Sequence, residues 1–133
     1  MTSPLILVVD DNYAGLLLVT SVLALDGFRV DSAASSDEVF QRLKVRLPDL
    51  ILMDVQLPGQ DGLSLTRQLK ANPTTAGIPI VALTAHAMPG DREAAIAAGC
   101  TDYFSKPIDT RTFSDQVRRI LDARLLEPGA SRK

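Results

Sequence analysis

The chain has 133 residues, the size of one domain, and 46% of them are hydrophobic. Its net charge is −2, from 14 basic and 16 acidic side chains, which gives no electrostatic basis for binding nucleic acid or an anionic membrane surface. No apolar run approaches the ~20 residues of a membrane span, and residues 1–4 lack the basic segment of a secretory signal. The single cysteine, Cys100, excludes an internal disulfide and is typical of a reducing compartment. We therefore predict one cytoplasmic domain that binds neither nucleic acid nor a membrane.

Strand-like and helix-like patterns alternate along the chain. Short β-branched apolar runs predict buried strands, and apolar residues at helical spacing predict helices between them. The expected strands cover about residues 5–9, 28–33, 50–54, 80–83 and 103–104, and the expected helices about residues 12–26, 37–45, 61–70, 89–99 and 109–124. This alternation favours an α/β fold, a parallel sheet with helices on both faces. We expect residues 1–126 to form the domain and residues 127–133 a flexible C-terminal tail.

Local residue types predict where the helices begin and end. Residues that favour the N-cap position precede three of them: Ser35 or Ser36, Asp61 or Gly62, and Asp109. Pro89 suits the first turn of the fourth helix, and Gly99 suits its end. Cys100, just before the last strand, is expected to be a small buried apolar residue.

Four of the five predicted strands run directly into polar side chains. Asp10 and Asp11 follow the first strand, Asp54 ends the third, Thr84 follows the fourth, and Lys106 comes shortly after the fifth. Each acid alone could be a turn former or a helix cap. Ligands of parallel sheets, however, bind beyond the carboxyl ends of the strands, where these groups gather together.

Three carboxylates in one place require a cation. Two of them at ~4 Å repel by about 4 kcal/mol at an effective dielectric constant of 20. Hard oxygen ligands suit Mg²⁺, which in turn recruits a phosphoryl group. An aspartate can attack that group, while Lys106 and Thr84 are suited to stabilise the developing charge. The pattern thus predicts a magnesium-dependent phosphoryl site.

Four segments carry a resemblance to a known family. They are residues 7–12 (LVVDDN), 49–58 (DLILMDVQLP), 81–85 (VALTA) and 103–107 (YFSKP). With all four in this order and at these spacings, the chain resembles a response-regulator receiver domain of two-component signalling over about residues 4–124. The resemblance implies a flavodoxin-like, doubly wound five-stranded parallel sheet of order 2-1-3-4-5 with five helices.

The resemblance implies how the acidic residues are used. Asp54 matches the phosphoacceptor, and the implied cofactor is Mg²⁺. Asp10, Asp11 and Asp54 match its carboxylate ligands, and Gln56 matches the position whose backbone carbonyl completes them. Gln56 and His86 match the two positions that flank the phosphoryl group, so we hypothesise that they tune its hydrolysis.

The resemblance also implies a switch that reads the phosphorylated state. Thr84 and Lys106 match the residues that contact the phosphoryl group, and Tyr103 matches an aromatic residue that moves inward when the threonine moves. The surface affected in the family is formed by the fourth helix, the fifth strand and the fifth helix. The peptide bond before Pro107 matches one that is cis in the family.

The implied activity is signalling rather than catalysis, beyond the chemistry of the domain's own phosphorylation and dephosphorylation. The phosphodonor would be a phosphohistidine of a sensor kinase or a histidine phosphotransfer protein. The signal would pass by contact to a downstream effector protein, with the chain a monomer or a weak dimer. We favour a stand-alone regulator, because no output segment follows Arg124. The alternative is a receiver excised from a hybrid histidine kinase.

Two other protein classes agree less well with the sequence. A flavodoxin-like electron carrier would need a hydroxyl- and glycine-rich phosphate loop after the first strand, where this chain has Asp10 and Asp11. A phosphatase with an aspartate nucleophile would need a second aspartate two residues after Asp54, where this chain has Gln56.

The first predicted helix offers a candidate docking surface for the phosphodonor. We expect Leu18, Val22 and Leu25 to face the core, which leaves Leu16 and Leu17 turned outward near the predicted site. Together with Tyr13 they would form an apolar patch. The alternative is a rotated helix that buries one of the two leucines.

Overall fold

The computed structural model describes residues 3–57, 61–84, 89–106 and 108–126. In chain order the elements are β1 (Leu5–Val9), α1 (Tyr13–Leu25), β2 (Arg29–Ala33), α2 (Ser36–Val45), β3 (Leu50–Asp54), α3 (Gly62–Ala71), β4 (Ile80–Thr84), α4 (Asp91–Ala98), β5 (Asp102–Ser105) and α5 (Phe113–Leu126). The strands form one parallel sheet of order β2-β1-β3-β4-β5. The predicted flavodoxin-like, doubly wound fold is therefore confirmed.

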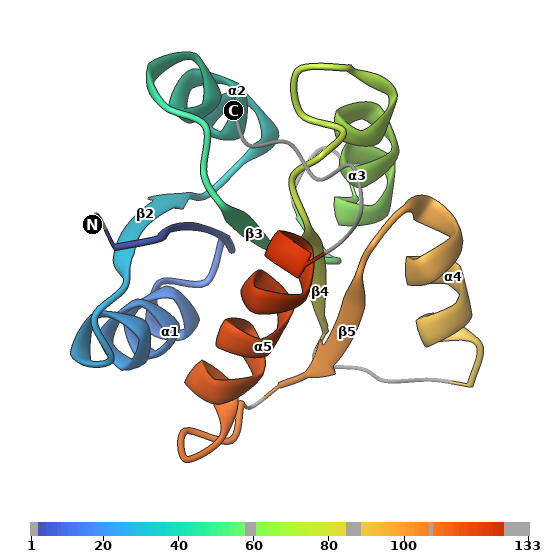
Figure 1. Cartoon of the computed structure of the whole chain (residues 1–133). Coiled ribbons are helices and arrows are strands. Elements are labelled where there is room, and N and C mark those ends of the chain that lie inside the picture. The colour runs from blue at the N-terminus through green and yellow to red at the C-terminus, as the bar shows by residue number, and fades with distance from the viewer. Residues whose placement is uncertain (1–2, 58–60, 85–88, 107, 127–133) are drawn as a thin grey trace.

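Helices cover both faces of this sheet. The helices α1 and α5 lie on one face, and α2, α3 and α4 lie on the other (Figure 1). Side chains alternate along β1, so that Ile6 and Val8 pack against the first pair of helices, whereas Leu7 and Val9 pack against the other three. Every residue of β1, β3 and β4 is buried, as expected for parallel strands covered on both faces. Only the ends of these strands remain open for a functional site.

Helix boundaries agree with several of the predictions. Ser35 is the N-cap of α2, where its side chain accepts a hydrogen bond from the Glu38 N–H at 3.3 Å. Asp61 is the N-cap of α3 and accepts from the Ser64 N–H at 2.9 Å. Gly99 ends α4 in the left-handed conformation, with a φ of 114°. These three predictions are confirmed, as is the burial of Cys100.

Two other boundary predictions were wrong. Pro89 precedes α4 instead of lying in its first turn, because Gly90 at a φ of 91° interrupts the helical backbone between them. Asp109 does not cap α5, which begins at Phe113. Its carboxylate instead accepts a hydrogen bond from the Arg111 N–H at 3.0 Å, which closes a turn ahead of the helix.

The orientation of α1 also differs from the prediction. Its buried residues are Val19 and Leu23, and Val22 packs partly buried beside them. Leu18 and Leu25, which were predicted to face the core, are 41% and 91% exposed. The reason is that α1 has no charged residue and is apolar on nearly every side, so its residue spacing does not single out one face.

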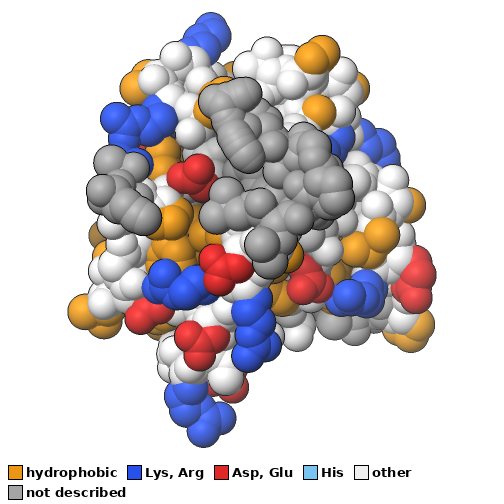
Figure 2. Space-filling model, viewed as in Figure 1, with side chains coloured by type: hydrophobic (Ala, Val, Ile, Leu, Met, Phe, Trp, Pro, Cys, Tyr) orange, Lys and Arg blue, Asp and Glu red, His pale blue; other side chains and the backbone are white. Residues whose placement is uncertain are grey.

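The surface carries charges of both signs. On the face seen in Figure 2, basic and acidic side chains are interspersed, and neither sign forms a continuous patch. Among the residues that the structure describes, no helix is both long enough and apolar enough to span a bilayer. The charges on this face therefore do not single out a binding surface.

Candidate functional site

The sheet register brings the polar groups of four strands together. The pairs at the carboxyl ends are Val9 with Met53, Asp54 with Leu83, and Thr84 with Ser105. Asp10 therefore lies beside Asp54, Thr84 is in the last pair of β4 with β5, and Lys106 lies one residue beyond that pair. The Lys106 N–H donates to the Thr84 carbonyl at 2.7 Å, which extends the ladder past β5. The predicted convergence of acids, hydroxyl and ammonium at one edge agrees with this geometry.

One lysine serves two buried carboxylates in this cluster. Lys106 Nζ donates to Asp10 Oδ2 at 2.8 Å and lies 3.6 Å from Asp54 Oδ2. Asp10, Asp54 and Thr84 are buried, while Asp11 is exposed at the rim. The cluster thus opens to solvent on the side of Asp11.

The second oxygen of each buried carboxylate is held by the backbone. The Asn12 N–H donates to Asp10 Oδ1 at 2.9 Å, and the Gln56 N–H donates to Asp54 Oδ1 at 3.0 Å. Each aspartate therefore closes a turn two residues ahead with one oxygen. In both cases the remaining oxygen, Oδ2, faces Lys106.

The charge of this cluster is not balanced by the protein. The pKa of Asp54 is raised from 3.8 to about 6, chiefly by burial and also by Asp10. The Gln56 N–H bond and the positive charge of Lys106 act in the opposite direction and lower it. Asp54 is thus held in a site that disfavours its ionised form until positive charge is added.

The donor set suits a divalent cation. Asp10, Asp11 and Asp54 each offer a carboxylate oxygen, and these oxygens all lie within 4.8 Å of one another. Three carboxylates against one ammonium leave an excess of negative charge, and hard oxygen ligands are those that Mg²⁺ prefers. The residues present therefore fit a bound metal ion, whose charge would favour the ionised form of Asp54, which burial disfavours.

Two glycines support the cluster, and their packing roles were not predicted from the sequence. A Cβ atom at Gly62 would lie 2.1 Å from the Asp54 carbonyl oxygen, so only glycine allows α3 to begin this close to β3. The Gly62 N–H also donates to the Val55 carbonyl at 2.8 Å. A Cβ atom at Gly15 would lie 3.0 Å from Asp10 Oδ2. The only sequence signal was a glycine inside a helix at Gly15 and a glycine after the N-cap at Gly62.

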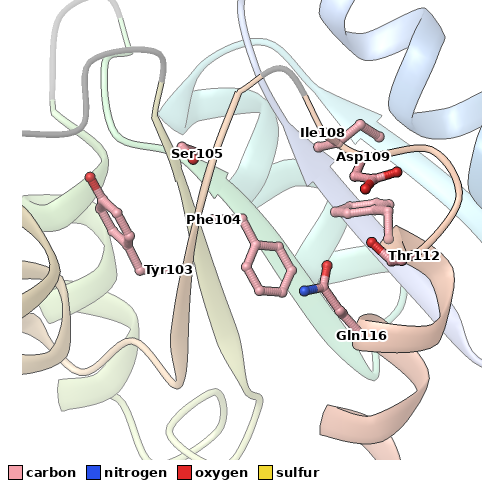
Figure 3. A pocket seen from close by; sticks show the side chains of 8 residues that line it. Tyr103, Phe104, Ser105, Ile108, Asp109, Thr112 and Gln116 are labelled. Atoms are coloured by element: carbon pink, nitrogen blue, oxygen red, sulfur yellow. The ribbon is translucent and has the colours of Figure 1, made fainter.

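Tyr103 and Phe104 point to opposite sides of β5. Tyr103 packs against the core shared by α2, α3 and α4, whereas Phe104 packs against the core of α1 and α5. Figure 3 shows this divergence, with the Phe104 and Tyr103 side chains directed away from each other. Phe104 and Phe113 meet edge to face at 5.9 Å and border a pocket of about 380 Å³ between β5 and α5. The Tyr103 hydroxyl is shielded from solvent, so Tyr103 already lies inward in this structure.

The predicted docking patch is only partly exposed. Tyr13 and Leu17, in the first half of α1, are 78% and 53% exposed. Leu16 is half-buried and packs against the core of α1 and α5, so its predicted outward orientation was wrong. The alternative, a rotated helix that buries one of the two leucines, agrees better with the half-buried Leu16. The physical reason is that Leu16 shares the helix face of Val19, three residues later.

Two of the predicted site residues are not among those that the structure describes. His86 and Pro107 lie outside the described residues. Gln56 is described, and its side chain is exposed beside Asp54.

The comparisons with known proteins agree with this geometry. The chain is 39% identical to the phosphate regulon transcriptional regulatory protein PhoB of Rhizobium meliloti, over 89% of the chain and 52% of that protein, and it spans smaller shares, 27% and 15%, of two further relatives. It is 35% identical to the polar-differentiation response regulator DivK of Brucella ovis, over 87% of the chain and 94% of that protein.

A solved structure and a family model match as well. The receiver domain of the sensor histidine kinase PA1611 from Pseudomonas aeruginosa has a magnesium ion coordinated in its active site cleft. It matches at 35% identity with a TM-score of 0.77, covering 92% of this chain and 97% of that one. The family model of the response regulator receiver domain matches residues 6–118. Since this match covers most of the sequence, the chain belongs to the response regulator receiver domain family of two-component signalling.

Proposed function

We propose that the chain accepts a phosphoryl group on Asp54 and passes the signal on by protein contact. The observation that carries this proposal is the setting of the Asp54 carboxylate, with Oδ1 held by the Gln56 N–H and Oδ2 facing Lys106 at 3.6 Å. A purely structural aspartate would have its charge balanced within the protein. Here the Asp54 carboxylate is buried, which raises its pKa, and it shares the Lys106 ammonium with Asp10.

The phosphodonor is a phosphohistidine of a sensor kinase or a histidine phosphotransfer protein. A carboxylate oxygen of ionised Asp54 forms the new P–O bond while the P–N bond to the imidazole breaks. The electron pair of the broken bond stays on the imidazole nitrogen, which takes a proton from solvent. Lys106 and the Thr84 hydroxyl stabilise the charge that develops on the phosphoryl oxygens.

The proposed cofactor is Mg²⁺, which would be held by Asp10, Asp11, Asp54 and the backbone carbonyl of Gln56. When bound, it supplies the positive charge that keeps Asp54 ionised and neutralises the phosphoryl oxygens. Asp11 lies exposed at the rim, where it can guide the ion toward the buried pair. The excess of carboxylates over ammonium groups supports this assignment.

The phosphorylated state is read by three residues. Phosphorylation adds about −1.5 to −2 charges, and Thr84 and Lys106 are drawn toward them. Tyr103 already lies inward and borders one cavity with Thr84, so the shift of Thr84 would hold Tyr103 in that position. This is a local charge event that biases a surface formed by α4, β5 and α5, with a coupling of about 1–3 kcal/mol.

The lifetime of the phosphoryl group is set by the two positions that flank it, Gln56 and His86. Replacing each with alanine should change the rate of loss of the phosphoryl group, followed by mass spectrometry of the intact protein. Unchanged rates in both variants would contradict this role.

The helix α1 is the proposed docking surface for the phosphodonor. It has no charged residue along its whole length, and Tyr13 and Leu17 expose apolar area next to the acidic cluster. We include Leu16 only as a support beneath this patch. Replacing Leu17 with glutamate should slow transfer from a phosphoprotein donor while sparing labelling by a small-molecule phosphodonor.

We further propose a stand-alone, cytoplasmic regulator that acts on an effector protein as a monomer or a weak dimer, with no nucleic acid or membrane as partner and no enzymatic output. The match over 94% of DivK supports the stand-alone form. A receiver domain excised from a hybrid histidine kinase remains the second candidate. The electron-carrier and phosphatase alternatives are not retained, because the chain belongs to the receiver family.

The decisive experiment is treatment with a small-molecule phosphodonor and Mg²⁺, followed by the mass of the intact protein. We expect one added phosphoryl group on the wild type and none on Asp54→Asn. The matched control is Asp102→Asn, which removes an aspartate from the same sheet but outside the cluster and should be labelled normally. Labelling that persists in Asp54→Asn would overturn the proposal.

A further inference from the structure

The Tyr103 hydroxyl lacks a hydrogen-bond partner among the described residues, although it is shielded from solvent. A buried donor without an acceptor costs about 1–3 kcal/mol. Native structures pair nearly all such groups with protein or with ordered water. The inward position of Tyr103 therefore calls for an acceptor within reach of its hydroxyl.

A cavity of about 240 Å³ adjoins this tyrosine and is lined by one carboxylate, that of Asp91. Tyr103 borders it together with Thr84, Gln56 and Asp91. Among the described residues around this cavity, Asp91 is the only acidic one. It is also close enough to act electrostatically, because the pKa of Tyr103 is raised first by burial and then by the negative charge of Asp91.

Asp91 lies in the first turn of a short helix that buries only small side chains. The helix α4 has eight residues, its N-cap Gly90 makes no side-chain hydrogen bond, and only Ala95 and Ala98 are buried. Two alanines bury little apolar area. A hydrogen bond from Tyr103 to this turn would add a second link between β5 and α4, beside the exposed ion pair of Arg92 with Asp102.

We propose that the Asp91 carboxylate accepts the hydrogen bond of the inward Tyr103 hydroxyl, directly or through one water molecule in the 240 Å³ cavity. Asp91 is then a positioning residue that joins the tyrosine on β5 to the first turn of α4. Movement of Tyr103 would be transmitted to α4 through this link. The hydrogen bond itself does not require a phosphoryl group. Only its role in signalling rests on the proposed function.

The test uses the fluorescence of Tyr103 in the metal-free, unphosphorylated protein. The chain has two tyrosines and no tryptophan, so Tyr13→Phe leaves Tyr103 as the only emitting residue. In this background we expect Asp91→Ala to increase quenching by acrylamide about twofold or more, as Tyr103 shifts toward outward conformations. Asp91→Asn, which keeps an acceptor oxygen, should restore most of the protection.

The matched control is Glu93→Ala, which removes the other acid from the first turn of α4. It should leave the quenching unchanged, and the same change in both alanine variants would overturn the proposal. Amide hydrogen exchange of the first turn of α4 provides the second readout. Asp91→Ala and Tyr103→Phe should each speed it, and the double variant should be no faster than the faster single variant.

Additive effects in the double variant would also overturn the link, because they would mean that Asp91 and Tyr103 act separately. None of these measurements depends on Asp54 or on a phosphodonor. Failure of the link is therefore distinguishable from failure of the proposed phosphoacceptor function, which is tested by labelling of Asp54.

Discussion

Aspartates occur in two settings in this sheet, at its outer edges and at the carboxyl ends of its central strands. On the edge strand β2, Asp31 accepts a hydrogen bond from the Ser32 N–H and faces Arg42 Nε at 3.5 Å. On the opposite edge strand β5, Asp102 accepts from the Tyr103 N–H and pairs with Arg92 at 3.1 Å. Each edge aspartate thus has one arginine from the following or preceding helix.

The central aspartates also accept a backbone N–H bond, but their charge is not matched. Asp10 and Asp54 share Lys106, and Asp11 adds a third carboxylate to the cluster. The local bonds differ in span, because the central carboxylates accept from the N–H two residues ahead and the edge carboxylates from the N–H of the next residue. The larger difference lies in charge balance: each edge aspartate has its own arginine, whereas the central carboxylates outnumber their one lysine.

The first and largest expected effect comes from removing the shared cation. Lys106→Ala should reduce the initial rate of labelling by a small-molecule phosphodonor at saturating Mg²⁺ by about 10²–10³-fold, because the developing charge loses its ammonium partner. Arg92→Ala removes a cation from the edge setting and should leave the rate within about twofold. Equal rate losses in the two variants would contradict the distinction between the settings.

The second effect concerns the close packing of the start of α3 against the backbone of Asp54. Gly62→Ala should lower the free energy of unfolding by about 2–4 kcal/mol, because its Cβ would lie 2.1 Å from the Asp54 carbonyl oxygen. The matched control is Gly77→Ala, where the added Cβ meets no atom within 4 Å. Chemical denaturation of both variants measures the difference. A Gly62→Ala protein as stable as the control would contradict this prediction, because it would mean that the backbone near Asp54 can shift at little cost in free energy.

The third effect is the pH dependence that follows from the unmatched charge. The pKa of Asp54 is raised to about 6, so the native protein binds its proton more tightly than the unfolded chain does. The stabilisation from this proton is present below about pH 4, and it is lost as the pH rises through about 6. The free energy of unfolding of the metal-free protein should therefore fall over this interval.

The same argument predicts the effect of removing the charge. At pH 7.5 in a chelator, Asp54→Asn should raise the free energy of unfolding by about 1–3 kcal/mol. Asp31→Asn, from the edge setting, should not raise it. Added Mg²⁺ should stabilise the wild type more than Asp54→Asn. An Asp54→Asn protein less stable than the wild type would mean that the carboxylate is already balanced by its surroundings.

The two settings also differ in how well they could be predicted from the sequence. The central strands are continuous apolar runs that end in polar residues, so both the sheet and the gathering of Asp10, Asp54, Thr84 and Lys106 were predictable. The edge pairs were not, because Asp31 and Arg42 are eleven residues apart on different elements and carry no spacing signal. Such pairs depend on how a helix packs on the sheet, which the local pattern does not contain.

The prediction of the buried face of α1 was wrong for a related reason. Prediction of a buried face needs a contrast between apolar and polar residues, and α1 offers almost none. Val19 and Leu23 face the core, while Leu18 and Leu25 do not, although all four are similar in polarity. The close approach of Gly62 to Asp54 was equally hidden, because it is made by backbone atoms that every residue shares.

The smallest expected effect tests the edge setting itself. Asp102→Ala removes the partner of Arg92, whose side chain is largely exposed, so solvent screening limits the loss to about 0–1 kcal/mol of the free energy of unfolding. The double variant with Arg92→Ala should cost little more than either single variant, because each already breaks the pair. Thermal unfolding at low and high salt measures both, and the difference between wild type and variant should shrink as salt rises. A loss of several kcal/mol that persists in high salt would mean that Asp102 shapes β5 beyond its ion pair, and the edge and central settings would then differ less than their charges indicate.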